Sequence, residues 1–493
     1  MTDETNDYQW KTLDKDLNRI SRVEYATIYV SRPMVGIGVS LAFVVLAALG
    51  AALTVGHEPG ALFVIVAAGI GAYMALNIGA NDVANNVGPA VGANALSMAG
   101  AIAIAAVFES AGALLAGGDV VATISSGIID PASVADARVF TWAMIAALLS
   151  AAVWVNTATW IGAPVSTTHS VVGGVMGAGI AAASFASVDW HTVGAIAASW
   201  IISPALGGII AALLLAFVNA RVVNRDDKLA AARRWVPILI GLMAGTFAVY
   251  LALKGLKQVV SLTTPMILGT GLALGAAAYA VSVPVVRRQS IGLENRNKSL
   301  KKLFGLPLVI SAALLSFAHG ANDVANAVGP LAAIVHAQQM GSFSNIVAIP
   351  PWVMAIGAFG ISFGLVLFGP RLIRIVGSQI TKLNPMRAYC VALSAATTVI
   401  AASWLGLPVS STHIAVGGVF GVGFYREWEA ERRARRVAAN RPPAKAIARE
   451  ERQRRKLVRR SHLLTIVAAW VITVPAAGFL SAGIFMALDA FLV

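Results

Sequence analysis

Long apolar segments separated by short polar loops run through almost the whole chain. The first covers residues 34–55, and many of the others are long enough to cross a bilayer as one helix, which takes about 20 apolar residues. The pattern predicts an all-α polytopic membrane protein with about 12–13 hydrophobic spans.

A polar motif interrupts two of these apolar segments. Residues 79–89 read Gly-Ala-Asn-Asp-Val-Ala-Asn-Asn-Val-Gly-Pro, and residues 320–330 repeat them with Ala327 in place of Asn86. An Asp between two Asn residues is a costly insertion into hydrocarbon unless it faces a partner or a cavity. One copy would also fit a polar contact that holds two helices together, but two copies favour a shared site. Because glycines and a Gly-Pro pair bracket the motif, we expect the helix to be interrupted there.

A second repeated motif opens a glycine-rich segment in each half of the chain. Residues 164–180 begin Pro-Val-Ser-Thr-Thr-His, residues 408–424 begin Pro-Val-Ser-Ser-Thr-His, and 11 of their 17 positions are identical. Pro and hydroxyl residues are favoured at helix starts, so each stretch predicts a half-helix. Free N–H groups, hydroxyls and the positive end of the dipole form an anion site, and two facing starts would clamp a tetrahedral oxyanion. The alternative is ordinary capping of two membrane helices.

The two motifs recur in the same order, which divides the chain into two repeats with additional segments. A half-helix or broken helix falls at the corresponding place in each repeat. The predicted parts are a cytoplasmic N-terminal segment (1–33), an extra span (34–60), transport repeat one (61–220), connecting spans with basic loops (221–303), and transport repeat two (304–493) with a basic cytoplasmic insert (425–461).

Loop charges predict how the repeats are oriented. The loop 184–191 has no Lys or Arg, whereas its counterpart 425–461 has 14. Because basic loops stay in the cytoplasm, these corresponding loops lie on opposite sides of the membrane and the repeats are inverted. The basic loops 221–234 and 287–302 then place the N-terminus inside and the C-terminus outside the cell (inner) membrane. Inverted repeats with re-entrant or broken helices are typical of secondary transporters.

The composition agrees with a membrane protein and excludes several other functions. Charged residues make up 12% of the chain, against about 25% in soluble domains. The net charge of +14 collects in a few loops, as the orientation rule requires, so nucleic acid is not expected as a partner. The single Cys390 excludes an intramolecular disulfide. No nucleotide-binding loop, nucleophile elbow or zinc-protease motif occurs, so we expect neither an enzyme nor a bound cofactor.

The two motifs supply the candidate binding residues. Oxygens that suit a hard cation belong to the first motif, although its amide N–H groups can instead donate to an anion. These residues are Asn81, Asp82, Asn85, Asn322, Asp323 and Asn326. The hydroxyl donors for an oxyanion belong to the second motif, at Ser166, Thr167, Thr168, Ser410, Ser411 and Thr412.

Four further ionisable residues lie in apolar sequence, namely His169, His413, His319 and Glu109. The first two follow the hydroxyl clusters, where a structural role is favoured over titration in a proton-coupled cycle. His319 lies four residues before Asp323 and is a candidate partner for it in a structural or proton-carrying role, although its counterpart in the other repeat is Ile78. Glu109 is an intramembrane carboxylate and therefore a functional candidate, but its counterpart is Ile361.

Together these motifs resemble the inorganic phosphate transporter family, the Pit-type permeases, over residues 61–490. The resemblance implies a symporter of inorganic phosphate with Na⁺ or H⁺, built from inverted repeats with re-entrant hairpins, surrounded by membrane lipid and commonly a homodimer. It implies cation coupling by Asn81, Asp82, Asn322, Asp323 and Glu109, with both aspartates as Na⁺ ligands if sodium is the cation. It implies phosphate binding by Asn85, Asn326 and the six hydroxyl residues named above.

Two other functions fit the same residues. One is a permease for sulfate or another tetrahedral oxyanion, and the other is a passive anion channel or exchanger. Moving an anion into a negative-inside cell costs about 2.3 kcal/mol per charge per 100 mV, so net uptake needs co-transported cations. For the basic insert 425–461 we expect a solvated cytoplasmic face, with binding of anionic lipid or a regulatory partner as the second choice.

Overall fold

The computed structural model describes residues 34–130, 133–134, 136–161, 165–255, 261–340, 349–379, 384–438 and 460–492. Within this part the chain is helical, and its one β-type pairing is an isolated bridge between Ile129 and Val188. The predicted all-α polytopic fold is therefore confirmed. The N-terminal segment 1–33, Pro164 and the centre of the basic insert (439–459) lie outside the described residues.

The described helices follow one another in the order of the chain. After the first helix, Met34–Val55, they are α2 (Ala61–Gly92), α3 (Met98–Ala116), α4 (Gly118–Ser126), α5 (Ala137–Ile161), α6 (Thr167–Ala182), α7 (Trp190–Val218), α8 (Lys228–Lys254), α9 (Thr264–Gln289), α10 (Asn297–Leu303), α11 (Gly305–Asp323), α12 (Ala325–Met340), α13 (Pro351–Gln379), α14 (Pro385–Trp404), α15 (Ser411–Ala438) and α17 (Arg460–Leu492).

Eleven helical segments of the described chain are long and apolar enough to cross a membrane, and the predicted extra span at Met34–Val55 is one of them. The half-helix α6, with 16 residues, and α15, which becomes densely charged in its second half, are not among them. These two helices account for the difference from the expected 12–13.

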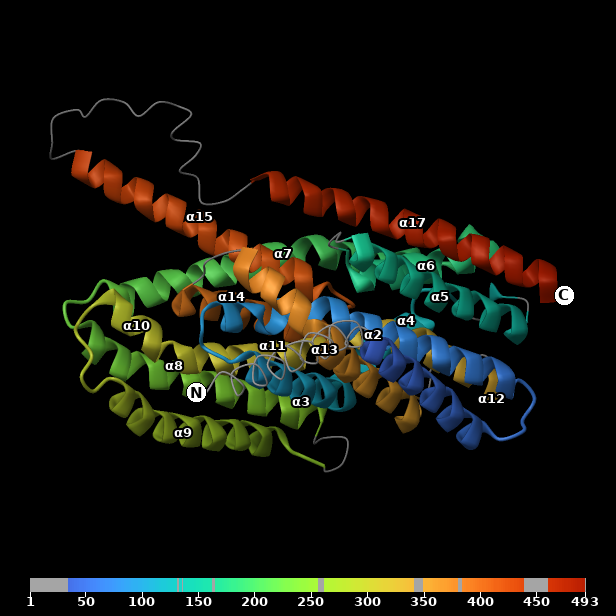
Figure 1. Cartoon of the computed structure of the whole chain (residues 1–493), viewed down its shortest axis with the longest axis horizontal. Helices are drawn as coiled ribbons and strands as arrows, with labels where there is room; N and C mark the ends of the chain where they lie inside the picture. Colours follow the sequence, from blue (N-terminus) through green and yellow to red (C-terminus); the bar gives the residue numbers. More distant parts are fainter. Residues whose placement is uncertain are drawn as a thin grey trace, which may run out of the picture.

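Most of the long helices lie side by side along the longest axis of the molecule (Figure 1). The helix pairs of the two repeats correspond: α2 packs on α13 as α11 packs on α3, and α6 packs on α17 as α15 packs on α7. Two apolar clusters result, one around α5, α6 and α12, and the other around α8, α11 and α14. Helix α2 passes from the first cluster, which contains Ile78, to the second, which contains Val83. The motif aspartate lies at this border.

Both motif helices continue through the motif, so the predicted interruption is wrong for the first copy and slight for the second. Helix α2 is a single helix of 32 residues that includes Pro89 in its last turn. Only Val324 separates α11 from α12, and its backbone N–H still bonds to the carbonyl of Gly320 at 3.3 Å. The glycines instead allow close helix contact: a methyl group on Gly79 would lie 1.9 Å from the backbone oxygen of Ile361.

The two motif helices run in opposite directions. The start of α2 lies beside the end of α12, where a methyl group on Gly60 would collide with the side chain of Gln338. The motifs themselves meet in the middle of the molecule. This antiparallel course is the arrangement that inverted repeats predict, while their orientation in a membrane stays a prediction.

Equivalent residues of the two repeats also touch each other directly. Ser110 Oγ lies 2.6 Å from Ser362 Oγ, and these serines occupy matching positions on α3 and α13. The rings of His169 and His413, which match on α6 and α15, have centroids 5.0 Å apart. Self-matching contacts of this kind occur where a two-fold axis passes between two copies of a unit.

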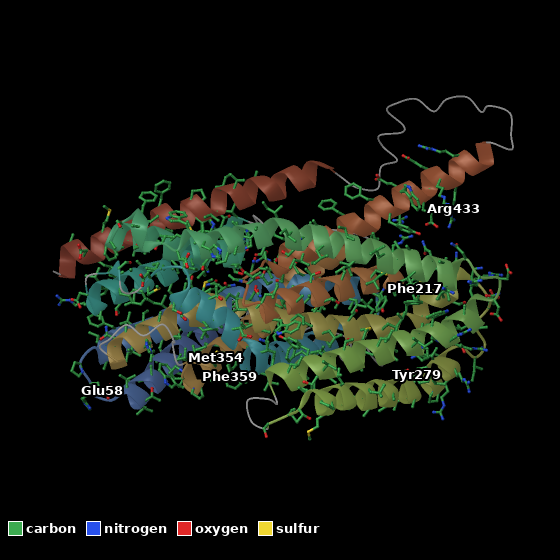
Figure 2. All side chains as sticks on the ribbon, turned by 180° about the vertical axis from the view of Figure 1, so that it is seen from behind. Glu58, Phe217, Tyr279, Met354, Phe359 and Arg433 are labelled. Atoms are coloured by element: carbon green, nitrogen blue, oxygen red, sulfur yellow. The ribbon has the colours of Figure 1, made fainter. Side chains whose placement is uncertain are left out.

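Basic side chains collect at one end of the molecule. Arg433 of α15 donates to Asn224 after α7, and Arg233 of α8 donates to Ser290 after α9, so three predicted cytoplasmic segments meet there. Figure 2 shows Arg433 at this end and Glu58 at the opposite end. Lys254, at the far end of α8, pairs with Asp119 of α4. The distribution supports the predicted placement of the basic loops on one side of a membrane.

Candidate functional site

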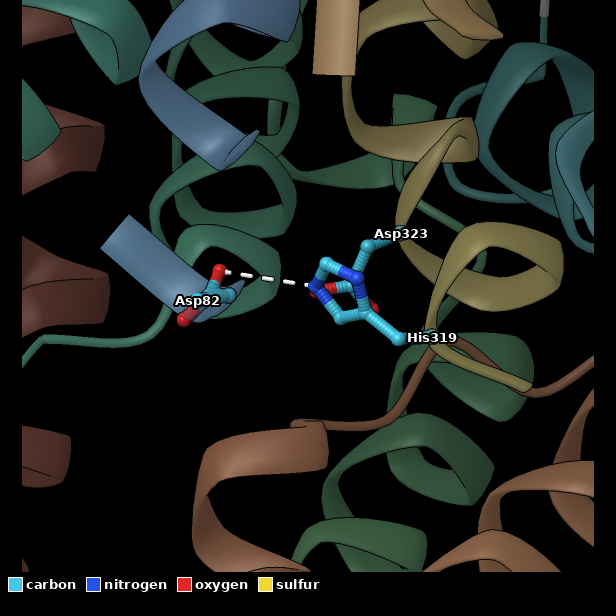
Figure 3. Close-up of side chains that lie close together, drawn as sticks. All are labelled: Asp82, His319 and Asp323. Atoms are coloured by element: carbon cyan, nitrogen blue, oxygen red, sulfur yellow. Dashed lines mark ion pairs between the residues drawn. The ribbon is translucent and has the colours of Figure 1, made fainter. Parts of the chain in front are cut away.

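Asp82 of α2 and Asp323 at the end of α11 lie in one buried cluster at the centre of the molecule (Figure 3). The hydroxyl of Thr167 links them, with Oγ1 at 3.3 Å from Asp82 Oδ2 and 3.4 Å from Asp323 Oδ2. Thr412 Oγ1 donates to the other oxygen of Asp82 at 2.9 Å. The structure therefore brings together the two aspartates that the sequence placed in separate repeats.

The ring of His319 lies among three carboxylates. Its Nε2 atom is 3.2 Å from Asp323 Oδ2 and 3.9 Å from Asp82 Oδ2, and its Nδ1 atom is 3.4 Å from Glu109 Oε2. All four side chains are almost fully buried. A neutral imidazole has one N–H and one nitrogen that only accepts. With carboxylates on both sides, the accepting nitrogen of a neutral His319 would face a carboxylate oxygen with no hydrogen between them. A further proton or a cation in the cluster would remove this unfavourable contact.

Both half-helices begin beside this cluster. Ser166 caps α6 by accepting from the backbone N–H of His169 at 3.2 Å, and Ser410 caps α15 by accepting from that of His413 at 3.4 Å. The positive ends of both helix dipoles therefore lie near the buried carboxylates and lower the cost of their charge. The predicted half-helix starts are present, each with a serine cap.

The amides of the motif bind the hydroxyls of the half-helices. Asn85 Nδ2 donates to Thr412 Oγ1 at 2.8 Å, and Asn326 Nδ2 donates to Thr168 Oγ1 at 3.2 Å. Thr168 in turn donates to the backbone oxygen of Val409 at 3.1 Å. Several of the residues expected to bind phosphate are thus adjacent, but in this conformation these bond to one another, to the backbone or to the aspartates.

The other two motif asparagines form hydrogen bonds to neighbouring parts of the structure. Asn322 donates to Ser403 Oγ at 2.9 Å, and its Oδ1 accepts from the backbone N–H of Val409 at 3.0 Å, which fixes the loop before α15. Asn81 donates to Oδ1 of Asp82 at 3.1 Å and accepts from Thr159 at 3.4 Å. Their part in cation coupling stays a prediction, because both amides also have a clear role in positioning the site.

The histidines that follow the hydroxyl clusters pack against an aromatic side chain. The His169 ring stacks on Trp200 with centroids 3.8 Å apart, and Trp200 Nε1 donates to the backbone oxygen of Pro408 at 3.0 Å. His413 lies edge-on to His169. This packing supports the structural role that the sequence favoured for both residues.

The oxygens of the cluster fit a cation substrate. Within the described part of the chain, several buried oxygens at this site have no hydrogen-bond partner, among them Asp323 Oδ1, Asn326 Oδ1 and Ser411 Oγ. Buried acceptors without partners are costly, and a bound ion would supply the missing interaction. Carboxylate, amide and hydroxyl oxygens together are ligands for a hard cation such as Na⁺.

Sequence reasoning missed three residues that complete the cluster. Asn86 donates to Glu109 Oε1 at 2.8 Å, while Thr159 and Ser403 bond to the motif asparagines as described above. The signal for Asn86 was available, because it is the position at which the two copies of the first motif differ. A signal was also available for Thr159 and Ser403, because these two hydroxyl residues occupy matching positions of the two repeats, each five residues before the second motif.

Comparison with known proteins adds evidence of a different kind. Residues 78–481 match the profile described as "Phosphate transporter family". A Helicobacter pylori protein named "Putative phosphate permease" is 43% identical, over 96% of this chain and 98% of its own. A Chlamydia trachomatis protein of the same name is 36% identical, over 87% of this chain and 99% of its own. A solved structure described as "The sodium-dependent phosphate transporter" superposes with a TM-score of 0.78 at 33% identity, covering 87% of this chain and 100% of that one.

Proposed function

Since this chain belongs to the phosphate transporter family, we propose that it imports inorganic phosphate in symport with Na⁺ or H⁺. Family membership makes it a multi-pass membrane transporter and not an enzyme. The solved relative is described as sodium-dependent, which makes Na⁺ the first cation to test. Sodium and phosphate are both substrates in this account, and no resident cofactor is needed.

One observation carries the proposal: a motif aspartate from each half of the chain lies beside the starts of both half-helices. Asp82 and Asp323 share the hydroxyl of Thr167, the first residue of α6. Carboxylates for a cation and hydroxyl and N–H donors for an oxyanion are therefore neighbours. A binding site for phosphate alone would not need two buried carboxylates, which repel an anion.

The hydrogen bonds also provide a physical basis for coupling. Each threonine hydroxyl has one hydrogen, so it cannot donate to a carboxylate and to a phosphate oxygen together. A cation bound at Asp82 and Asp323 would compete for their oxygens and release the hydroxyls of Thr167 and Thr412. The released hydroxyls, with the amides of Asn85 and Asn326, would then donate to phosphate. Cation binding would precede phosphate binding, and uptake without the cation would be disfavoured.

The finer topology belongs to the same proposal. We place the basic end of the molecule in the cytoplasm, the N-terminus inside and the C-terminus outside an inner membrane. The segments 61–220 and 304–493 act as two inverted transport repeats, supported by the antiparallel motif helices and the paired helix contacts. We further propose a homodimer surrounded by lipid.

Uptake of labelled phosphate into proteoliposomes tests the proposal. With an inward Na⁺ or H⁺ gradient, the wild type should take up phosphate, whereas Asp82→Asn and Asp323→Asn should insert normally and take up none. Asp119→Asn removes a carboxylate outside the site and is the matched control, which should retain uptake. Full uptake by both site variants would overturn the proposal. Block by excess sulfate but not by excess unlabelled phosphate would assign the site to sulfate instead.

A further inference from the structure

Three polar residues beside the aspartates, two from the first repeat and one from the second, form a series of contacts that has no polar counterpart at the equivalent helix crossing. Asn86 donates to Glu109 Oε1 at 2.8 Å, and Glu109 Oε2 lies 3.4 Å from Nδ1 of His319. All three side chains are almost fully buried. Their counterparts in the other repeat are the buried apolar residues Ala327, Ile361 and Ile78.

The other half serves as an internal control for packing. Gly320 meets the backbone oxygen of Glu109 in the same way that Gly79 meets that of Ile361, so the two helix crossings are alike. Apolar side chains are sufficient to fill the crossing of α2 and α13. Burying an amide, a carboxylate and an imidazole at the crossing of α3 and α11 is costly, and packing alone does not require it. We therefore expect these three polar side chains to have a function at the point where their series of contacts ends.

This series of contacts ends at Nε2 of His319, which points at the two aspartates (Figure 3). Nε2 has no hydrogen bond within the described residues, yet it lies 3.2 Å and 3.9 Å from Oδ2 of Asp323 and Asp82. Thr167 Oγ1 lies 3.3 Å and 3.4 Å from oxygens of the same aspartates. Ligand atoms about 2.0–2.1 Å from a tetrahedral metal stand about 3.4 Å apart. These four distances, 3.2–3.9 Å, are close to the spacing of ligand atoms around such a metal.

We propose that Asp82, Asp323 and His319 bind a divalent transition-metal cation, with Thr167 as the fourth ligand. An imidazole nitrogen suits a transition metal such as Zn²⁺, whereas hard cations such as Na⁺ prefer oxygen ligands. The two aspartate charges balance a divalent ion.

The one-sided residues then have defined roles. Glu109 accepts the Nδ1–H of His319 and so leaves the lone pair of Nε2 for the metal, the usual support for a histidine ligand. Asn86 fixes Glu109. The inference shares both aspartates with the proposed phosphate symport, so a divalent metal and the coupling cation should exclude each other.

Cobalt binding by the purified full chain tests this site without phosphate or transport. Co²⁺ is titrated into sodium-free, detergent-solubilised protein and followed by visible absorption and elemental analysis. The wild type should bind one Co²⁺ per chain in a form displaced by Zn²⁺ and weakened by excess Na⁺. His319→Gln should abolish this binding, and Glu109→Gln should weaken it by about 10–100-fold. Ser311→Ala, which removes a buried hydroxyl of α11 that donates to the carbonyl of Leu308, should bind like the wild type.

Equal Co²⁺ binding by the wild type and His319→Gln, or no binding by the wild type, would overturn the proposal. If His319→Gln does not fold, electron paramagnetic resonance of the wild type with Co²⁺ decides instead: nitrogen coupling supports the site, and an all-oxygen ligand set contradicts it. Phosphate uptake is measured separately. A wild type that binds no Co²⁺ but takes up phosphate would refute the metal site alone, and one that binds Co²⁺ but takes up no phosphate would refute the symport alone.

Discussion

Replacing Gly320 by alanine should disturb the crossing of α3 and α11, which positions Glu109 against His319. A methyl group at this position would lie 2.0 Å from the backbone oxygen of Glu109, whereas ordinary contact begins at 3.4 Å. The helices must therefore separate by about 1.4 Å. Overpacking of this size costs about 1–3 kcal/mol of stability. It would also lengthen the 3.4 Å contact between Glu109 and His319, so phosphate uptake should fall together with stability.

The assay is thermal unfolding in detergent combined with phosphate uptake by the same preparation. Gly305→Ala is the matched control, since it lies on the same helix with nothing within 4 Å of the added methyl group. Alanine also favours helix over glycine, so this control should be neutral or slightly stabilising. A Gly320→Ala protein with the wild-type unfolding midpoint and wild-type uptake would refute the close crossing of α3 and α11.

Three further substitutions test individual contacts. Thr167→Val keeps the shape but removes the donor shared by the aspartates, so uptake should fall by about 10–100-fold with normal insertion, and unchanged uptake would contradict its role. Asn322→Ala removes the amide that fixes the loop at Val409, so both the unfolding midpoint and uptake should fall, and a variant as stable as the wild type would show that the loop is held elsewhere. Lys254→Ala breaks a partly exposed ion pair with Asp119 worth less than about 1 kcal/mol, so neither quantity should change measurably.

The presence of two copies of each motif made the centre of the site predictable. Apolar sequence tolerates an aspartate only where it has partners, and two such aspartates in matching positions had to face each other or a common cavity. The structure agrees for Asp82 and Asp323, which share one hydroxyl. Loop charges predicted which ends of the helices lie together, because that pattern depends on charge alone and needs no knowledge of packing.

The course of the motif helices was not predictable from local rules. Glycine and proline favour a break, yet α2 continues to Gly92 because Pro89 removes only one backbone donor near the helix end. The glycines serve close contacts with α13 and α3, which involve residues far away in the sequence. Likewise, the bonds from Asn322 to the loop before α15 depend on tertiary packing, so sequence alone could not separate its positioning role from ion binding.

The accumulation ratio of phosphate tests the central claim most directly. Proteoliposomes containing the wild type receive an inward Na⁺ gradient or an inward H⁺ gradient separately, and internal and external phosphate are measured at steady state. Symport predicts that internal phosphate rises above the external concentration with at least one of the two gradients, and that the excess disappears when the gradient is collapsed. Internal phosphate that never exceeds the external concentration under either gradient would contradict cation-coupled transport.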